Sequence, residues 1–319
     1  MGKTAAEIRQ ALRAGIFCFN VESAPELEAI DREARRMRTI ARVALRINPD
    51  VEAHTHRYIT TGVAESKFGI DPRTAARLLR RHRSYAGLRI MGIHLHIGSQ
   101  ITQSKPFLEA IRRAGRLIEQ ARAWGVPIEW LNLGGGLGII YKDEHPQTPE
   151  QFARAVLPLL APLRVRLILE PGRFIVGNAG ILVTEVLYIK RSRAKQFAVV
   201  DAGMNDLIRP ALYGAYHEVI PTTATPRASN GLSRYDVVGP ICESADVFAR
   251  DRRLGRMRPG QRLAVLGAGA YGSTMASNYN GRMRPAEVLV RGRRWAVIRR
   301  RETHRDLIRH DVIPRALLA

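Results

Sequence analysis

The chain has 319 residues, of which 45% are hydrophobic, and this is enough for a sizeable core and for more than one domain of about 150 residues. No stretch approaches the roughly 18 uncharged apolar residues of a membrane span, and the N-terminus has no apolar secretory segment, so we expect a soluble, cytoplasmic protein. Two cysteines, Cys18 and Cys242, are too few for a disulfide framework or a cysteine metal cluster.

The charge balance is strongly basic. Lysine and arginine outnumber aspartate and glutamate by 51 to 29, which gives a formal net charge of +22, a balance typical of nucleic-acid-binding proteins. Nearly all of the excess is arginine, however, and the arginines are scattered along the expected helices instead of being interleaved with aromatic residues. We therefore expect a solvated basic surface, with nucleic-acid binding as the weaker alternative.

Up to about Glu170, short β-rich runs alternate with longer helical stretches, which is the pattern of βα units around a parallel sheet. The expected strands are Ile16–Val21, Arg42–Ile47, Ile90–Ile97, Glu129–Leu133 and Arg166–Glu170. The expected helices lie near Pro25–Thr39, Pro72–His82, Pro106–Trp124 and Pro149–Leu160. A closed (β/α)8 barrel needs eight strands and five can be placed, so either the sheet is open or three units are missing.

Beyond Gly180 the chain changes to β-rich runs without long helices. The strands expected there are Ile181–Ile189, Phe197–Val200, Tyr235–Val238, Arg262–Leu266, Ala286–Val290 and Trp295–Arg299. The stretch 221–233, rich in Thr, Pro, Ala and Ser, is typical of an exposed loop. The sequence therefore predicts two domains, an incomplete (β/α) barrel over residues 1–176 and a C-terminal β-barrel or sandwich over residues 177–319.

Polar residues of the first half gather directly after the expected strands, where a (β/α)8 barrel keeps its active site. His94 and His96 point to the same face of their strand, but no third ligand follows at metal spacing, so they are either core histidines or ligand-facing ones. Gly134, Gly135 and Gly136 form either a tight turn or a loop whose N–H groups approach a phosphate.

Three further groups of residues have both a structural and a functional interpretation. Glu170 and Arg173 form either a structural ion pair or a rim at which the carboxylate keeps a heterocyclic nitrogen protonated. Cys242, in a Gly-Pro loop beside Glu243, is either a small buried hydrophobic residue or a reactive, proton-donating group. Cys18 lies in an apolar strand, and we expect it to be part of the core. Tyr271 lies in glycine-rich backbone and either packs or reaches a phosphate or substrate.

Seven segments, read together, resemble one family in order and spacing. They are His54-Thr55-His56 through Ser66-Lys67-Phe68-Gly69, His94 to Gln100, Leu133 to Gly138, Glu170-Pro171-Gly172-Arg173, Asp201 to Pro210, Gly239 to Ser244, and Gly269 to Gly272. The chain resembles the diaminopimelate decarboxylase family, within the fold-type III decarboxylases that use pyridoxal phosphate (PLP) and have alanine racemase-like barrels. The Asn-Asp-Leu-Ile-Arg-Pro and Cys-Glu-Ser segments separate this family from the ornithine and arginine decarboxylases.

The resemblance implies a role for each matching residue. His96 would stack on the pyridine ring of PLP, Ser99 with Gly134, Gly135 and Gly136 would hold its phosphate, and Glu170 would pair with its ring nitrogen. The motif residues Pro171, Gly172 and Arg173 belong to the same cofactor site, and Tyr271 lies near it. The substrate contacts would be Arg173, Arg209, Tyr213, Glu243 and Tyr271. Cys242 would donate the proton after CO2 leaves, from a loop supplied by the partner subunit of a homodimer.

The implied activity is conversion of meso-2,6-diaminopimelate to L-lysine and CO2, the last step of lysine biosynthesis. The alternatives are a related decarboxylase of the carboxynorspermidine type and an inactive PLP-binding pseudoenzyme. In the family the cofactor-anchoring lysine lies on the first barrel strand in a segment like Tyr-Ala-x-Lys, and none of the six lysines here has that context. We therefore expect residues 1–319 to lack three βα units and, on their own, to be poorly soluble and inactive.

Overall fold

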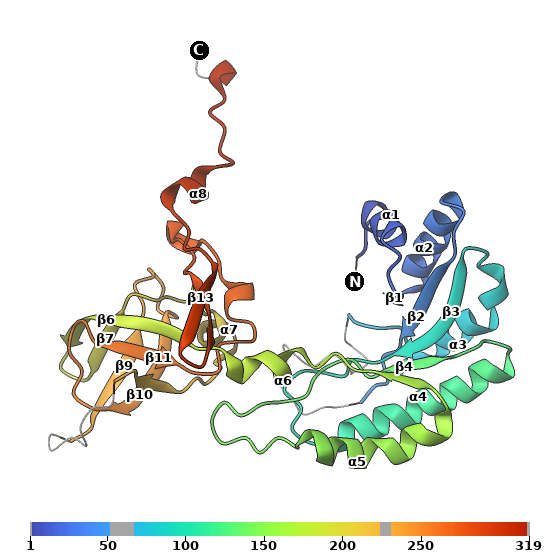
Figure 1. Cartoon of the computed structure of the whole chain (residues 1–319), viewed down its shortest axis with the longest axis horizontal. Coiled ribbons are helices and arrows are strands. Elements are labelled where there is room, and N and C mark those ends of the chain that lie inside the picture. Colours follow the sequence, from blue (N-terminus) through green and yellow to red (C-terminus); the bar gives the residue numbers. More distant parts are fainter. Residues whose placement is uncertain (1, 52–66, 224–230, 318–319) are drawn as a thin grey trace. The chain divides into compact units, whose positions relative to one another are not determined.

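A computed structural model describes residues 2–51, 67–223 and 231–317 (Figure 1). The chain divides into two compact units, each with its own hydrophobic core. The first unit comprises Met1–Ile140 and Glu144–Ile175, and the second comprises Tyr141–Asp143 and Val176–Ala319. The segment His54-Thr55-His56 and the centre of the loop expected over residues 221–233 lie outside the described residues.

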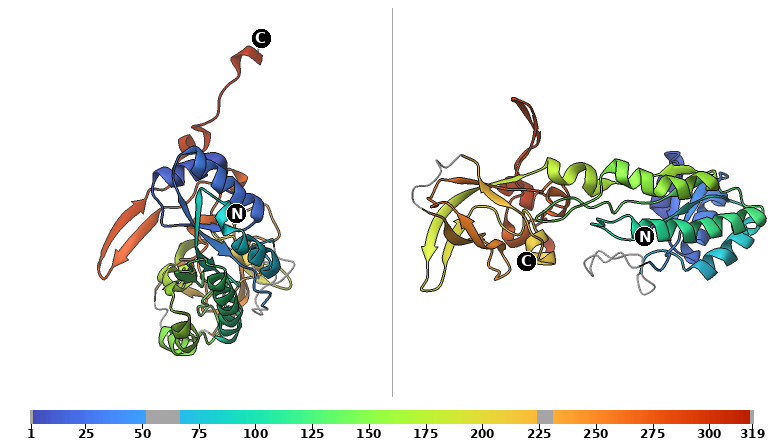
Figure 2. Two further views of the ribbon diagram at one scale, coloured as in Figure 1. Left: turned by 90° about the vertical axis from the view of Figure 1, so that its right-hand side faces the viewer. Right: turned by 90° about the horizontal axis from the view of Figure 1, so that it is seen from below.

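The first unit is built on a parallel sheet whose strands stand side by side in chain order. Its strands are β1 (Phe19–Val21), β2 (Ala41–Arg46), β3 (Leu88–His94), β4 (Trp130–Asn132) and β5 (Arg166–Ile168). Its helices are α1 (Ala5–Arg13), α2 (Ala24–Arg36), α3 (Pro72–Arg80), α4 (Lys105–Ala123) and α5 (Pro149–Leu160). In the views of Figure 2 these helices run alongside the strands, and α4 contacts both α3 and α5.

Helix starts in this unit follow from the sequence. The side chains of Thr4, Ser23, Asp71 and Thr148 each accept a hydrogen bond from the backbone amide three residues ahead, at the starts of α1, α2, α3 and α5. Such a cap contributes about 1 kcal/mol because it satisfies an amide that has no partner inside the helix. Prolines occupy the first turn of α2, α3, α4 and α5, where no N–H is needed.

The edge strand β5 is less well covered than the core strands of the sheet. The core strands β2, β3 and β4 are nearly continuous runs of buried residues, as expected for a parallel sheet covered on both faces. Along β5 and just after it, by contrast, Leu167 and Leu169 are 38% and 41% exposed. Within the described residues no further strand pairs with β1 or β5, which confirms the prediction of an incomplete barrel built from five βα units.

The second unit contains a six-stranded, largely antiparallel sheet with the order β10-β9-β7-β6-β11-β8 and a separate hairpin of β12 and β13. Its strands are β6 (Leu182–Arg191), β7 (Gln196–Val200), β8 (Val219–Pro221), β9 (Ser233–Val238), β10 (Val247–Leu254), β11 (Arg262–Val265), β12 (Glu287–Arg291) and β13 (Arg294–Arg299). The short helices of this unit are α7 (Arg209–Tyr213) and α8 (His304–Ile308), whereas α6 (Gly172–Val176) follows β5 and lies in the first unit up to Ile175. The 3-10 turns of the first unit are His82–Ser84 and Ala161–Leu163, and those of the second unit are Gly177–Ala179, Ser273–Met275, Tyr279–Gly281 and Arg315–Leu317.

Some elements were not anticipated. The sequence carries no clear signal for α1, β8 and β10, and β10 is hidden because its residues 250–253 are all charged and its pairing with β9 shifts register twice. The expectation that Cys18 lies in a core strand is wrong, because β1 begins only at Phe19 and Cys18 is half-buried before it. None of the helices in the described part of the chain is both long and apolar enough to cross a membrane.

Candidate active site

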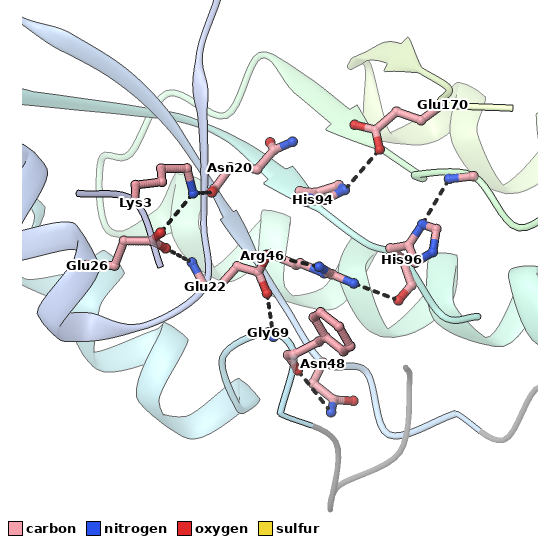
Figure 3. A network of polar contacts seen from close by, with 12 residues as sticks. Lys3, Asn20, Glu22, Glu26, Arg46, Asn48, Gly69, His94, His96 and Glu170 are labelled. Atoms are coloured by element: carbon pink, nitrogen blue, oxygen red, sulfur yellow. Dashed lines mark hydrogen bonds and ion pairs between the residues drawn. The ribbon is translucent and has the colours of Figure 1, made fainter. Parts of the chain in front are cut away.

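Three polar side chains lie next to each other in a row at the carboxyl ends of the central strands, and Figure 3 shows two of them, Arg46 and His94. Arg46 on β2 is in register with His94 on β3, and His94 is in register with Asn132 on β4. Residues in register on parallel strands point to the same face of the sheet. The row therefore places a guanidinium, an imidazole and an amide next to each other at one end of the sheet.

Glu170, which follows β5, is held at the end of this row. Asn132 donates from Nδ2 to Glu170 Oε1 at 2.7 Å, and its own Oδ1 accepts from the backbone amide of Gly134 at 2.8 Å. The Glu170 amide in turn donates to the carbonyl oxygen of Gly134 at 2.7 Å. Asn132 thus fixes the Glu170 carboxylate relative to the loop of Gly134, Gly135 and Gly136, which we call the glycine loop. No sequence motif singles out Asn132.

His94 is a buried imidazole, only 4% exposed, and neither ring nitrogen has a hydrogen bond within the described residues. Burial, with smaller contributions from the charges of Arg46, His96 and Lys3, lowers its pKa from 6.5 to about 3. Its Nε2 lies 3.8 Å from Glu170 Oε2, which would be an ion pair only if the ring were protonated. Burial is the larger effect because the Glu170 side chain is 43% exposed, so the ring is neutral at pH 7.

His96 lies two residues beyond the end of β3 and faces the glycine loop. Its Nδ1 accepts a hydrogen bond from the Gly135 amide at 3.1 Å, so the proton of the neutral ring is on Nε2. Burial and the charge of Arg46 lower its pKa, while Glu170 acts in the opposite direction. The result is a neutral, planar ring whose edge is tied to the loop after β4.

The glycine loop can contain only glycine for steric reasons. A Cβ at Gly135 would overlap the carbonyl oxygen of Glu170, and a Cβ at Gly136 would lie 2.5 Å from the carbonyl oxygen of Gly98. Gly136 also has φ +104°, in the region that other residues rarely adopt. The loops that follow β3, β4 and β5 therefore meet in direct backbone contact, which brings Gly134 to Gly136 beside Ser99 and Glu170.

Arg173 and Ser99 connect the same loops from the other side. Arg173, in α6 and 7% exposed, donates from Nη2 to Ser99 Oγ at 3.0 Å. Pro171 and Gly172 form the turn that leads from Glu170 into α6, and Gly172 donates its amide to the Glu170 carbonyl at 2.8 Å. All predicted cofactor residues of the first unit thus lie at one edge of its sheet, the edge formed by the carboxyl ends of the strands.

A buried ion pair supports this edge and was not predicted from the sequence. Arg46 Nη1 lies 3.0 Å from Glu22 Oε1, and both side chains are at most 10% exposed. Burial raises the pKa of Glu22, but the charge of Arg46 and hydrogen bonds from Arg46 and the Gly69 amide outweigh it, so the pKa is lowered. Arg46 also lies over the Phe68 ring at 4.8 Å and reaches the His96 carbonyl at 3.5 Å. The sequence feature that could have indicated this ion pair is the arginine at the end of an apolar strand.

Lys3 also belongs to the polar network of Figure 3. Its Nζ lies 2.8 Å from both the Asn20 carbonyl and Glu26 Oε1, and Glu26 Oε2 accepts from the Glu22 amide at 2.6 Å. This lysine is therefore a structural ion-pair partner that ties the start of the chain to the end of β1.

The remaining predicted residues belong to the second unit. Cys242 and Glu243 are exposed in the loop between β9 and β10, and Tyr279 donates its hydroxyl to Glu243 Oε1 at 2.6 Å. The buried Asp246, 3% exposed, holds this loop by accepting from the amides of Ile241 and Met204 at 2.7 Å each. The loop that carries the thiol is therefore fixed by a carboxylate at its base.

Arg209 and Tyr213 begin and end α7, and Tyr271 lies in the glycine-rich stretch after β11. Arg209 is 6% exposed, and its guanidinium lies 4.4 Å from the ring of Tyr141. Tyr271 is 44% exposed and has φ +58°, an unusual conformation for a non-glycine residue. Such backbone strain is more frequent at ligand sites than elsewhere.

The chain matches known proteins over nearly its whole length. Residues 1–177 match the family described as pyridoxal-dependent decarboxylase, pyridoxal binding domain. A diaminopimelate decarboxylase of Pseudomonas aeruginosa is 48% identical over 310 residues, which are 96% of this chain and 73% of the relative. One from Aquifex aeolicus is 46% identical over 95% of this chain and 72% of the relative.

Solved structures agree with these matches. Diaminopimelate decarboxylase from Helicobacter pylori, complexed with L-lysine, has a TM-score of 0.92 at 40% identity and covers 97% of this chain and 76% of its own. The enzyme from M. jannaschii, also in complex with L-lysine, has a TM-score of 0.91 at 40% identity, covering 99% of this chain and 74% of its own.

Proposed function

This chain belongs to the diaminopimelate decarboxylase family of pyridoxal-dependent decarboxylases, and we propose that it converts meso-2,6-diaminopimelate to L-lysine and CO2 with PLP as cofactor. The observation that carries the proposal is the edge at which His96, the glycine loop and the Asn132-held Glu170 meet. The domain division that we propose, residues 1–176 and 177–319, assigns this edge to the barrel.

The residues at this edge fit the chemistry of PLP. Glu170 offers a carboxylate to a ring nitrogen, neutral His96 offers a flat ring for stacking, and the buried nitrogens of His94 have no hydrogen bond within the described residues. We propose that Glu170 pairs with the pyridine nitrogen, that His96 stacks on the ring, and that Ser99 with Gly134, Gly135 and Gly136 holds the phosphate. When bound, PLP supplies an acceptor for the electron pair that the departing CO2 leaves behind.

The chain's own residues would bind the substrate and move one proton. Carboxylates of a diacid suit the planar, always charged guanidinium groups of Arg173 and Arg209. Glu243 suits an ammonium group, and its Oε1 is already oriented by the Tyr279 hydroxyl at 2.6 Å. We propose Tyr213 and Tyr271 as further substrate contacts, Tyr271 also lying near the cofactor.

Cys242 is the proposed proton donor to the carbon that has lost CO2. Its side chain is exposed on a loop whose base is fixed by Asp246, so the thiol is presented outward from a rigid support. We propose that this loop serves the site of a second copy of the chain in a homodimer. We also propose a cytoplasmic location, in keeping with a biosynthetic enzyme.

The experiment that tests the function supplies the full-length protein with PLP and measures the L-lysine and CO2 formed from meso-diaminopimelate. We predict that both products form in equal amounts. Faster CO2 release from carboxynorspermidine, ornithine or arginine would reassign the substrate. No turnover of any of these would favour a PLP-binding pseudoenzyme.

A further inference from the structure

Among the described residues of the second unit, His217 is the most deeply buried ionisable side chain, with an exposure of 0%, and the proposed mechanism gives it no role. It lies between α7 and β8, two residues before Val219, at which the pairing of β8 with β11 begins. Both ring nitrogens have a polar neighbour: Nδ1 lies 2.7 Å from the Leu266 carbonyl oxygen, and Nε2 lies 2.8 Å from Arg209 Nη1.

These two partners fix the protonation state of the ring. A carbonyl oxygen can only accept a hydrogen bond, so Nδ1 must carry the proton that points to Leu266. A guanidinium can only donate, so Nε2 must present its lone pair to Arg209. The ring is therefore neutral, with its single proton on Nδ1, since a second proton on Nε2 would face an N–H of a cation.

The surroundings hold the guanidinium of Arg209 as firmly as the imidazole. The ring of Tyr141 lies 4.4 Å from the guanidinium carbon and contacts the His217 ring edge-on, at 5.4 Å and 76°. Gly267 leaves room for this tyrosine, because a Cβ there would lie 3.2 Å from two of its ring carbons. Arg209 is thus held against one aromatic face and tied by one nitrogen to His217.

The backbone of His217 is anchored as well. Arg252 Nη2 donates to the His217 carbonyl at 2.9 Å, and the same guanidinium lies 3.7 Å from the Tyr216 ring and 3.7 Å from Glu218 Oε2. The Leu266 amide donates to the Glu218 carbonyl at 2.8 Å. The imidazole is therefore held by backbone contacts at the start of β8 and the end of β11, and its contact with Arg209 restrains the guanidinium.

We propose that His217 is a positioning residue that, as the neutral Nδ1–H tautomer, orients the Arg209 guanidinium toward a carboxylate of the diacid substrate. The inference rests on the proposed function, because that function assigns Arg209 to a carboxylate of the substrate. A neutral acceptor is suited to this position because it satisfies one N–H of the guanidinium without placing a negative charge beside it. A carboxylate in the same place would offset the positive charge of the guanidinium.

Two variants separate hydrogen bonding from packing. His217→Gln supplies one planar group with both a donor for Leu266 and an acceptor for Arg209, whereas His217→Phe keeps a ring against Tyr141 and removes both nitrogens. In the full-length protein, we expect His217→Phe to raise the KM for meso-diaminopimelate about tenfold or more, the usual effect of losing a hydrogen bond to a charged group, with a smaller change in kcat. His217→Gln should stay within about threefold of the wild type in KM.

Two readouts do not depend on turnover. The 15N shifts of the imidazole should show the proton on Nδ1, and titration calorimetry with pimelate, a dicarboxylate without amino groups, should show affinity that His217→Phe loses and His217→Gln retains. A proton on Nε2, or equal KM and pimelate affinity in wild type and His217→Phe, would overturn the inference. If the wild type binds pimelate with this dependence but does not decarboxylate meso-diaminopimelate, the proposed function fails and the positioning role stands.

Discussion

Acid should destabilise the first unit through one buried imidazole, His94. In the folded protein burial lowers the pKa of this group from 6.5 to about 3, whereas the unfolded chain takes up the proton near 6.5. Between these two pH values the unfolded state binds one proton more than the folded state, so stability is lost as the pH falls through this window. Above pH 6.5 the contribution is fully present.

The magnitude follows from the two pKa values. The gap between 6.5 and about 3, at about 1.4 kcal/mol for each pH unit, corresponds to about 5 kcal/mol of unfolding free energy. This is a large part of the total stability of a typical domain, roughly 5–15 kcal/mol. His96 acts in the same direction because its pKa is also lowered by burial. Glu22, whose pKa is lowered below 4.5, adds its own loss of stability only in more acidic solution.

Urea unfolding followed by circular dichroism between pH 7.5 and 4.5 tests this prediction. The unfolding free energy of the wild type should fall with decreasing pH by about 1.4 kcal/mol per unit for each histidine that stays neutral. His94→Gln, which cannot titrate, should remove the share of that slope that belongs to His94. An unchanged slope in His94→Gln would show that the imidazole is not held neutral, and the reasoning from burial would be refuted.

Two further predictions concern the same edge of the sheet. Gly135→Ala should lower the unfolding free energy by about 2 kcal/mol or more, because the new Cβ overlaps the Glu170 carbonyl. In the control Gly172→Ala the new Cβ has no neighbour within 4 Å, so the unfolding free energy should change by less than about 0.5 kcal/mol. Equal urea midpoints for the two variants would contradict the close packing of these loops. Glu22→Gln leaves Arg46 buried without its charged partner and should cost about 3 kcal/mol at pH 7, while a cost below about 1 kcal/mol would mean that the pair is solvated.

Much of the first unit could be predicted because its signals are local. The alternation of apolar runs with capped, proline-initiated helices places β2 to β5 and α2 to α5 within a few residues of their actual bounds. Parallel strands gather their carboxyl ends at one edge, so the sequence by itself indicates that His96, Gly135 and Glu170 meet there.

The parts that escaped prediction depend on partners that are distant in the chain. Nothing near Arg46 indicates that it pairs with Glu22, because the contact forms only when β1 and β2 lie side by side. His217 reads as an ordinary histidine, since its partners Arg209 and Leu266 are brought to it by α7 and β11. In the same way, β10 becomes recognisable as a strand only through its bulged pairing with β9.

Cofactor affinity measured with and without the Glu170 charge tests the proposed site most directly. PLP is titrated into the full-length protein carrying wild-type Glu170, Glu170→Gln or, as the matched control, Glu119→Gln at an exposed position of α4, and binding is followed by absorbance. Saturable binding of one PLP per chain is expected in all three, with a dissociation constant raised about tenfold or more in Glu170→Gln, where a charge-assisted hydrogen bond is lost, and unchanged in Glu119→Gln. Equal affinity in wild type and Glu170→Gln, or no saturable binding in the wild type, would contradict the placement of the cofactor at the carboxyl end of this sheet.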